Sequence, residues 1–526
     1  MTTLKLACGA LRGTHDGKVH AFKGIPFGEP LDARSRWQAP RPRAPWSGTR
    51  DATRYGGACT QFGARGRPLP WPRDRARYFA ALEALGKSRE GDDCLLLNVW
   101  TPTLDPQARL PVMVWIHGGG FASGAANEVY DGAHLAARGA VIVVLQYRLG
   151  PLGFLHGSEL FGDGLCADNR GFLDQMLALS WVQEHIGGFG GDAGNVTLFG
   201  ESAGAFAIYQ LTASPQARGL FRRAIAMGGM AETSAPVENY HALTRDVLAD
   251  VGVRAGDAEA LIALDAGQLQ AAHRAISKRV FARGPGRYGE LSRTRIGFLG
   301  AATGTPFLPR PALETYAHGT PNSIDLMLGT CANDGGLFSL VLPFAGLSGR
   351  IYSRLLIPDD GAPAQLARYR QLLPDAGARR LREQLNNDAF YRGPTLRAAR
   401  AHAAAHPGRT FHYQLDYRGA LDALGAIHAI DVALLFGSAR VRQLLTDDAG
   451  TAALSAAMAE LWTSFARSGT PRAPGLPEWP AFDARGEHTL VLDRRSHLES
   501  RLDAHLLDGW PAADAAPAPL AAQAAG

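Results

Sequence analysis

The stretch Gly200-Glu201-Ser202-Ala203-Gly204 has the residue types and spacing that best fit a chemical step. It follows an apolar run at 196–199 and precedes a helix-compatible run at 205–211, so Ser202 would lie on a sharp turn between a strand and a helix. Glycines two positions either side of the serine let the strand and the helix approach without a clashing Cβ. The pattern predicts a serine nucleophile that attacks a carbonyl carbon. The alternative is a serine that caps a helix after a glycine-rich turn.

A second glycine-rich stretch, His117-Gly118-Gly119-Gly120-Phe121, directly follows the apolar run 112–116. Its peptide N–H groups can face a ligand at close range, and such donors bind the oxyanion that forms when a carbonyl becomes tetrahedral. The N–H of the residue after the serine would complete the set at a helix N-terminus. The two motifs in this order predict an oxyanion hole made by Gly119, Gly120 and Ala203. The alternative is that this stretch is only a glycine-rich turn that links two elements, which would not account for both motifs occurring in this order.

The elements that must position these motifs can be read from apolar runs bounded by Gly, Pro or Asp, which predict buried strands. They lie at 112–116, 141–146, 196–199, 224–227, 324–328, 411–415 and 489–492. Helical patterns lie at 364–373, 379–385, 395–405, 452–466 and 173–186, where Leu173, Leu177, Ser180 and Trp181 share one face. Strands alternating with helices predict an α/β fold with a mostly parallel, twisted sheet covered by helices on both faces. Both motifs then follow the carboxyl ends of strands.

Length and composition favour a globular enzyme, since 46% of the 526 residues are apolar and 20% are charged. We expect one catalytic domain over 1–510, with inserted helical regions at about 230–300 and 335–405. The segment 511–526 is almost wholly Ala, Pro and Gly, which predicts a disordered tail.

Several function classes are excluded by the same sequence. The five cysteines have no metal-site spacing such as C-x-x-C, so neither a metal nor another cofactor is expected. No apolar run approaches the roughly 20 residues of a membrane span, and the first residues lack the apolar stretch of a secretory signal. We therefore predict a cytoplasmic protein. A net charge of +5 on this length gives no reason to expect a nucleic-acid partner.

Five further segments carry a family resemblance over nearly the whole chain. They are Phe22-Lys-Gly-Ile-Pro-Phe-Gly28, Pro45-Trp-Ser-Gly48, Asp93-Cys-Leu-Leu-Leu-Asn-Val-Trp100, Gly171-Phe-Leu-Asp-Gln175 and Phe189-Gly-Gly-Asp192. With the two motifs above, the chain resembles the type-B carboxylesterase and lipase family, which includes cholinesterases and bacterial para-nitrobenzyl esterases. The resemblance implies an α/β-hydrolase fold with a gorge. It also implies a serine esterase that forms an acyl-enzyme on small to medium carboxylic esters.

The resemblance also implies the partners of the serine. Asp334, in Gly329-Thr-Cys-Ala-Asn-Asp-Gly335, stands where the family acid lies, but most members resemble one another in having glutamate there. The aspartate is shorter by one bond of about 1.5 Å, so either the loop moves inward or the hydrogen bond changes. His428 matches the family's histidine, which makes it the base; His412 is the second choice. Ser202, Asp334 and His428 follow one another in the chain order expected of this fold.

Three accessory positions follow from the same resemblance. Glu201 resembles a buried glutamate that supports water and histidine in the gorge; the alternative is a solvent-facing acid. Cys59 and Cys94 match a pair that in many members closes a loop beside the gorge entrance, so they are a candidate disulfide, which a reducing cytoplasm can leave open. The stretch Ala226-Met-Gly-Gly229 lacks a serine that usually stands there, which removes a hydrogen bond near the triad.

The substrate remains open between three interpretations. Eleven arginines stand between Arg34 and Arg77 against two aspartates, and with Arg283, Arg287, Arg293 and Arg295 they suggest the hypothesis of anionic esters. A lipase acting on acylglycerols is a weaker alternative, because no large apolar lid is marked. A binding-only member is weaker still, because nucleophile and histidine are both present. The expected partner is thus a small-molecule ester, and the protein could be a monomer or a dimer.

Overall fold

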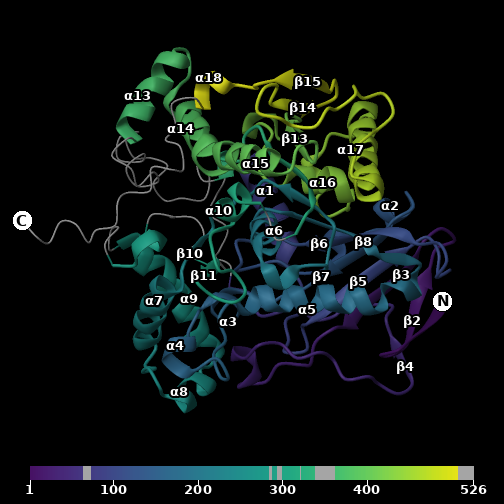
Figure 1. Ribbon diagram of the computed structural model, residues 1–526, viewed down its shortest axis with the longest axis vertical. Coiled ribbons are helices and arrows are strands. Elements are labelled where there is room, and N and C mark those ends of the chain that lie inside the picture. The colour runs from purple at the N-terminus through teal and green to yellow at the C-terminus, as the bar shows by residue number, and fades with distance from the viewer. Residues whose placement is uncertain (63–72, 283–286, 293–298, 320–321, 338–361, 508–526) are drawn as a thin grey trace, which may run out of the picture.

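A large twisted sheet forms the centre of the protein in the computed structural model, which describes residues 1–62, 73–282, 287–292, 299–319, 322–337 and 362–507 (Figure 1). Within these residues the sheet has 13 strands in the order β1-β2-β3-β5-β7-β6-β8-β9-β12-β13-β14-β15, with β4 paired to β2. All neighbours from β7 to β14 are parallel, whereas β1, β2, β3, β5 and β15 join antiparallel. The predicted tail 511–526 lies outside the described residues.

The strands include all seven predicted runs. They are β1 (Thr2–Leu6), β2 (Gly9–His15), β3 (His20–Pro26), β4 (Thr49–Asp51), β5 (Leu96–Thr101), β6 (Leu110–Ile116), β7 (Val141–Leu145), β8 (Gly191–Glu201), β9 (Arg223–Met227), β12 (Asp325–Cys331), β13 (Thr410–Leu415), β14 (His488–Leu492) and β15 (His497–Ser500). A separate parallel pair joins β10 (Ser234–Pro236) to β11 (Ala301–Thr303).

Helices surround the sheet on both sides (Figure 1). They are α1 (Arg73–Gly86), α2 (Ala133–Ala136), α3 (Gly150–Phe154), α4 (Ser158–Phe161), α5 (Arg170–His185), α6 (Ala203–Ala213), α7 (Val237–Asp250), α8 (Ala258–Ala263), α9 (Ala266–Ala282), α10 (Ala312–Ala317), α13 (Ala362–Leu372), α14 (Ala378–Asn387), the π-helix η6 (Asp388–Arg392), α15 (Gly393–Ala405), α16 (Ile430–Phe436), α17 (Ala449–Ser468) and α18 (Ala504–Leu507). Helices α7 to α9 fall in the first predicted insertion, and α13 to α15 fall in the second.

Successive side chains of the central strands point to opposite faces of the sheet and pack into two separate cores, one on each face. On β6, Val112, Val114 and Ile116 belong to a first core, which also takes the apolar residues of α5 and α6. Met113 and Trp115 of the same strand belong to a second core, which takes α16 and α17. Every one of these strand residues is fully buried, as a parallel sheet covered on both faces requires.

The face predicted for helix α5 is only partly internal. Trp181 is buried, but Leu173 and Leu177 are half-buried and Ser180 is exposed, whereas Asp174 is fully buried. The reason is Arg148, which is also buried and binds Asp174 through two N–H···O contacts of 2.8 and 2.6 Å. An internal ion pair of this kind turns a charged position into a core position, so apolar periodicity alone points to the neighbouring face.

Candidate active site

Ser202 lies on the turn between β8 and α6, in a backbone conformation (φ 55°, ψ −122°) that a non-glycine residue rarely adopts. The flanking glycines are required by contact: a Cβ on Gly200 would lie 2.6 Å from the Ile116 carbonyl oxygen, and one on Gly204 would clash with the same oxygen. The helix-capping alternative is not what the structure shows, because the serine makes no side-chain capping bond to α6. The hydroxyl is left available for another use.

The loop after β6 lies directly against this turn. A Cβ on Gly118 would lie 2.8 Å from a Glu201 carboxylate oxygen and 3.1 Å from the Cβ of Ser202. Gly119 and Gly120 follow with φ of 114° and 63°, which side chains would strain. The N–H groups of Gly119, Gly120 and Ala203 donate no hydrogen bond to any acceptor among the described residues. Three free donors thus surround the serine, which is what an oxyanion hole requires.

The carboxylate of Asp334 and the imidazole of His428 are paired and buried. The distance from Asp334 Oδ1 to His428 Nδ1 is 2.7 Å, and Asp334 Oδ2 accepts a 2.7 Å hydrogen bond from the Cys331 N–H. The two loops are joined beside them, since the Asn333 N–H donates to the Ala426 carbonyl at 2.9 Å. The shorter aspartate therefore keeps a short, charge-assisted hydrogen bond to the histidine.

Gly228 connects the serine turn to this pair. The Ser202 N–H donates to the Met227 carbonyl at 3.0 Å, and a Cβ on the next residue, Gly228, would lie 3.4 Å from Asp334 and 3.5 Å from His428. This is the position where the sequence lacks the usual serine. The structure therefore brings Ser202, Asp334 and His428 together at the carboxyl ends of three strands, β8, β12 and β13. In the sequence, the first and the last of these residues are 226 positions apart.

Glu201 stands against the other nitrogen of the imidazole. Its Oε1 lies 3.0 Å from His428 Nε2, and only 2% of the residue is exposed, so the alternative of a solvent-facing acid is wrong. No hydrogen bond joins the Ser202 hydroxyl to His428 among the described residues. In the absence of substrate such bonds are often long or poorly aligned, so their absence does not exclude a serine–histidine pair.

Burial and neighbouring charges set the protonation of this group. Burial raises the pKa of Glu201 to about 8, against the opposing charge of His428. Burial by itself lowers the pKa of His428, but Glu201 and Asp334 outweigh it and raise the pKa to about 9. Glu201 raises the pKa of His428 only while its carboxyl is ionised, and its full burial favours the protonated carboxyl. We therefore assign a proton to Glu201 near neutral pH, which leaves the imidazole able to act as a base.

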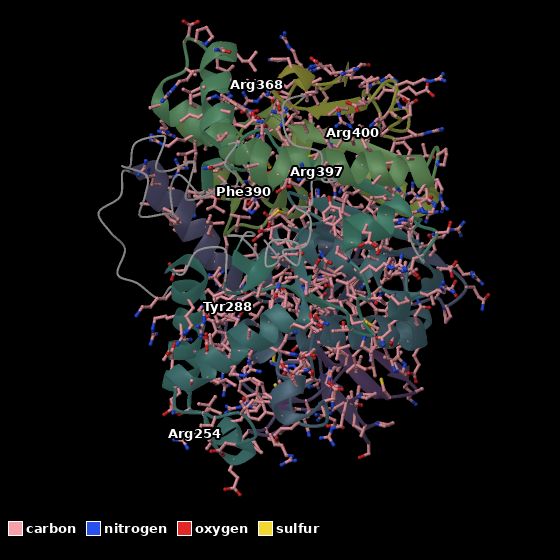
Figure 2. The ribbon with its side chains drawn as sticks, turned by 60° about the vertical axis from the view of Figure 1, so that its left-hand side comes forward. Arg254, Tyr288, Arg368, Phe390, Arg397 and Arg400 are labelled. Atoms are coloured by element: carbon pink, nitrogen blue, oxygen red, sulfur yellow. A yellow bond between two sulfur atoms is a disulfide. The ribbon has the colours of Figure 1, made fainter. Side chains whose placement is uncertain are left out.

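Three further residues lie near His428, and two of them, Tyr391 and Tyr78, carry no signal in the sequence. Asp431 is buried, with its pKa raised to about 7 by burial and by Asp334. The ring of Tyr391 lies 5.2 Å from the imidazole ring. It comes from η6, which continues directly into α15; Figure 2 labels Phe390 of η6 and Arg397 of α15. The phenol of Tyr78 contacts the His428 backbone. Only Asp431 had a sequence signal, as the acid three positions after the histidine.

The remaining predicted site residues are also placed. Cys59 and Cys94 form a disulfide. His412, the second choice for the base, lies within β13 with its Nδ1 2.9 Å from the Thr489 hydroxyl. Within the described part of the chain, no group of three or more His, Cys, Asp or Glu side chains is arranged to hold a metal ion. None of the helices described has the length and apolar character needed to cross a membrane.

The arginines behind the anionic-ester hypothesis are mostly held by partners where they are described. Arg287 lies 2.6 Å from Asp246 Oδ2, so its charge is offset. Arg283, Arg293 and Arg295 lie outside the described residues. In the 34–77 stretch, Arg36 and Arg77 donate to backbone carbonyls, and Arg43 lies 3.3 Å from Glu29.

Comparison with known proteins decides the family. A model of the carboxylesterase family matches residues 1–352 and 365–510. The para-nitrobenzyl esterase of Bacillus subtilis is 33% identical over 503 residues, which cover 94% of this chain and 95% of that protein. The chain belongs to the carboxylesterase family. The medium-chain fatty acyl-CoA hydrolase precursor of Anas platyrhynchos is 31% identical over 517 residues, with coverage of 94% and 87%.

Solved carboxylesterase structures share the fold. A carboxylesterase of Geobacillus stearothermophilus matches with a TM-score of 0.81 and 30% identity, over 97% of this chain and all of the other. A para-nitrobenzyl esterase structure matches with a TM-score of 0.77 and 31% identity, over 96% and 98%. The predictions of an α/β-hydrolase fold and of this family are confirmed. As a carboxylesterase family member, the protein is a serine hydrolase that cleaves carboxylic esters.

Proposed function

We propose that the protein hydrolyses small to medium carboxylic esters through an acyl-enzyme, with Ser202 as nucleophile, His428 as base and Asp334 as the acid that orients it. The observation that carries the proposal is the 2.7 Å contact between Asp334 Oδ1 and His428 Nδ1, beside a serine on a strained turn. A carboxylate on Nδ1 fixes the tautomer that leaves Nε2 free to accept a proton.

The steps follow from this arrangement. Nε2 of His428 takes the proton of Ser202 as its oxygen attacks the ester carbonyl, and Asp334 stabilises the imidazolium. The N–H groups of Gly119, Gly120 and Ala203 bind the oxyanion; each such donor contributes about 3 kcal/mol in comparable sites. His428 then protonates the departing alcohol, and water attacks the acyl-enzyme by the same route to release the acid.

A fluorophosphonate probe tests the nucleophile. The wild-type protein is expected to be labelled at Ser202, and Ser202→Ala should abolish labelling and lower kcat on p-nitrophenyl acetate by on the order of 10⁶-fold. Ser158 is a matched control, because its hydroxyl also lies near an acid and a histidine, 2.6 Å from Asp168 and 3.3 Å from His241. Ser158→Ala should keep full labelling. Labelling that survives in Ser202→Ala would overturn the proposal.

The substrate class is chosen by elimination among the described features. A binding-only role leaves the free donors and the buried acid–histidine pair without a use. The paired state of Arg287 removes one support of the anionic-ester hypothesis. Esterase and lipase are separated by rates on p-nitrophenyl esters of increasing chain length: we expect a maximum kcat/KM at short to medium acyl chains, without activation at the solubility limit. No cofactor is proposed, and a cytoplasmic location stays a prediction from sequence.

A further inference from the structure

The backbone carbonyl of His428 accepts a hydrogen bond from a residue 350 positions earlier in the chain. The donor is the Tyr78 hydroxyl on helix α1, at 3.0 Å, and the tyrosine side chain is fully buried. Among the described residues, no backbone N–H donates to this carbonyl. Burial, followed by the nearby charge of Glu201, holds the pKa of Tyr78 well above its usual range, so the phenol keeps its proton.

This carbonyl belongs to a peptide at a strained point of the chain. The next residue, Ala429, has φ 67° and ψ 9°, which is the left-handed region that residues with a Cβ enter only at a cost. The turn is closed by an Ile430 N–H to Ile427 carbonyl bond of 3.2 Å, and α16 begins at Ile430. Such a conformation persists where surrounding contacts hold it, and the Tyr78 hydroxyl is a contact on the peptide that bears the imidazole.

Helix α1 is docked firmly enough to hold that peptide in place. Arg77 donates to the Gln443 carbonyl at 2.7 Å near the start of the helix, and Asn127 donates to the Ala84 carbonyl at 3.0 Å near its end. Between them, Tyr78 and Ala81 pack into the same core as the residues that flank His428. The helix also lies within the loop closed by the Cys59–Cys94 disulfide.

We propose that Tyr78 is a positioning residue for the base of the reaction: its hydroxyl holds the His428 peptide, and through it the imidazole, in place against Asp334. The inference rests on the proposed function, because it takes His428 as the base. Helix α1 is then part of the framework of the active site, although it contains none of its motifs. A loss of the hydroxyl affects the step in which the imidazole moves a proton and leaves ester binding unchanged.

A second buried tyrosine in the same core offers a matched control. The Tyr417 hydroxyl lies 2.9 Å from the Thr451 hydroxyl and 3.1 Å from that of Thr446, and the residue is 2% exposed. Its partners lie near the start of α17 and carry none of the proposed chemistry. Tyr417→Phe therefore removes a buried phenol hydrogen bond from the same core without touching the His428 peptide.

The test compares Tyr78→Phe with Tyr417→Phe on p-nitrophenyl acetate. We expect Tyr78→Phe to lower kcat roughly 3- to 10-fold, the rate equivalent of one ordinary hydrogen bond, with KM changed less than about twofold. The rate of fluorophosphonate labelling should fall in parallel, because the same base activates Ser202. Tyr417→Phe should leave kcat and the labelling rate within about twofold of wild type, while both variants lose similar thermal stability.

A spectroscopic readout keeps the test independent of turnover. The proton between His428 Nδ1 and Asp334 is followed by proton NMR at low field, and it should shift in Tyr78→Phe and stay in place in Tyr417→Phe. An unchanged kcat and an unchanged resonance in Tyr78→Phe, or equal losses in both variants, would overturn the inference. Failure of the proposed function is recognised separately, since Ser202→Ala would then still be labelled.

Discussion

The two halves of the proposed active site are held in different ways. On the nucleophile side, Gly118, Gly200 and Gly204 leave so little room that the backbone of the turn and that of the oxyanion loop nearly touch. On the other side, Asp334 and His428 stand on separate loops and are joined by side-chain contacts, with Tyr78 and Asn333 securing the backbone. One half is fixed by the absence of side chains, and the other is fixed by their presence.

This difference explains how each half responds to change. Where backbones touch, any added atom displaces the loop, so the required residue is glycine and the requirement is visible in the sequence. Where side chains meet across loops, a different side chain of suitable length and charge can make the same contact. The aspartate at 334, where the family resemblance led us to expect glutamate, fits such an exchange, since it contacts His428 at 2.7 Å.

Among the variants that test this comparison, we expect the largest effect from removing the charge on the side-chain half. Asp334→Asn keeps the shape of the group but cannot stabilise the imidazolium, and the amide can favour the wrong tautomer of His428. We expect kcat to fall by about 10³- to 10⁴-fold in ester hydrolysis assays at neutral pH, with the fold retained by circular dichroism.

Asp334→Glu is the conservative partner of that variant. It keeps the charge and lengthens the side chain, so we expect a loss of only about tenfold, since the loops on this side can adjust. A loss as large as that of Asp334→Asn would break the comparison, because it would mean that this half is fixed as strictly as the other.

The next effect tests the backbone half. In Gly118→Ala the new Cβ would lie 2.8 Å from the Glu201 carboxylate and 2.9 Å from its carbonyl oxygen, so the oxyanion loop must move. We expect kcat/KM to fall by about 10²- to 10³-fold, the effect of losing a well-placed oxyanion donor. Gly187→Ala is the control, because a Cβ there meets nothing within 4 Å. Wild-type activity in Gly118→Ala would contradict the crowding described for this loop.

The smallest effect concerns Glu201, which joins the two halves. Because Glu201 carries a proton near neutral pH, Glu201→Gln replaces one neutral group with another and should leave the pKa of His428 unchanged there. Since the imidazole must be neutral to act as base, the acidic limb of the kcat/KM profile should stay in place, with a change in maximum rate of less than about tenfold. Glu159→Gln, at an exposed acid, is the control and should leave the limb in place. A limb that moved to lower pH in Glu201→Gln would refute the protonation assigned to Glu201, because it would mean that ionised Glu201 had been raising the pKa of His428.

Much of the fold could be predicted because its signals are local. The apolar runs from 112–116 to 489–492 all became strands, since a parallel sheet covered on both faces needs continuous apolar segments. The strands before residue 110 went unpredicted. In β1, for example, half-buried and exposed residues alternate, and its short pattern does not stand out from a loop.

The side-chain half of the site could be predicted only in part. Asp334 and His428 were assigned through a family resemblance, and their contact depends on loops 94 residues apart. Tyr78 carried no signal, because a tyrosine in a helix is an ordinary core residue until its hydroxyl is seen to meet a particular carbonyl. The buried pair of Arg148 and Asp174 likewise placed a charged residue of α5 in the interior, where the apolar pattern did not mark one. Such features arise from packing between distant segments, and no local pattern encodes them.

The division of the interior into two cores has a consequence for how activity is lost on heating. The helix that follows Ser202 is anchored in the first core, whereas the segment around His428 is anchored in the second. Nucleophile and base thus depend on separate layers, and a slight sliding of one layer over the other would part them while both stay intact. Ester hydrolysis therefore depends on the alignment of the two layers. On heating, activity should be lost a few degrees below the temperature at which the helices unfold.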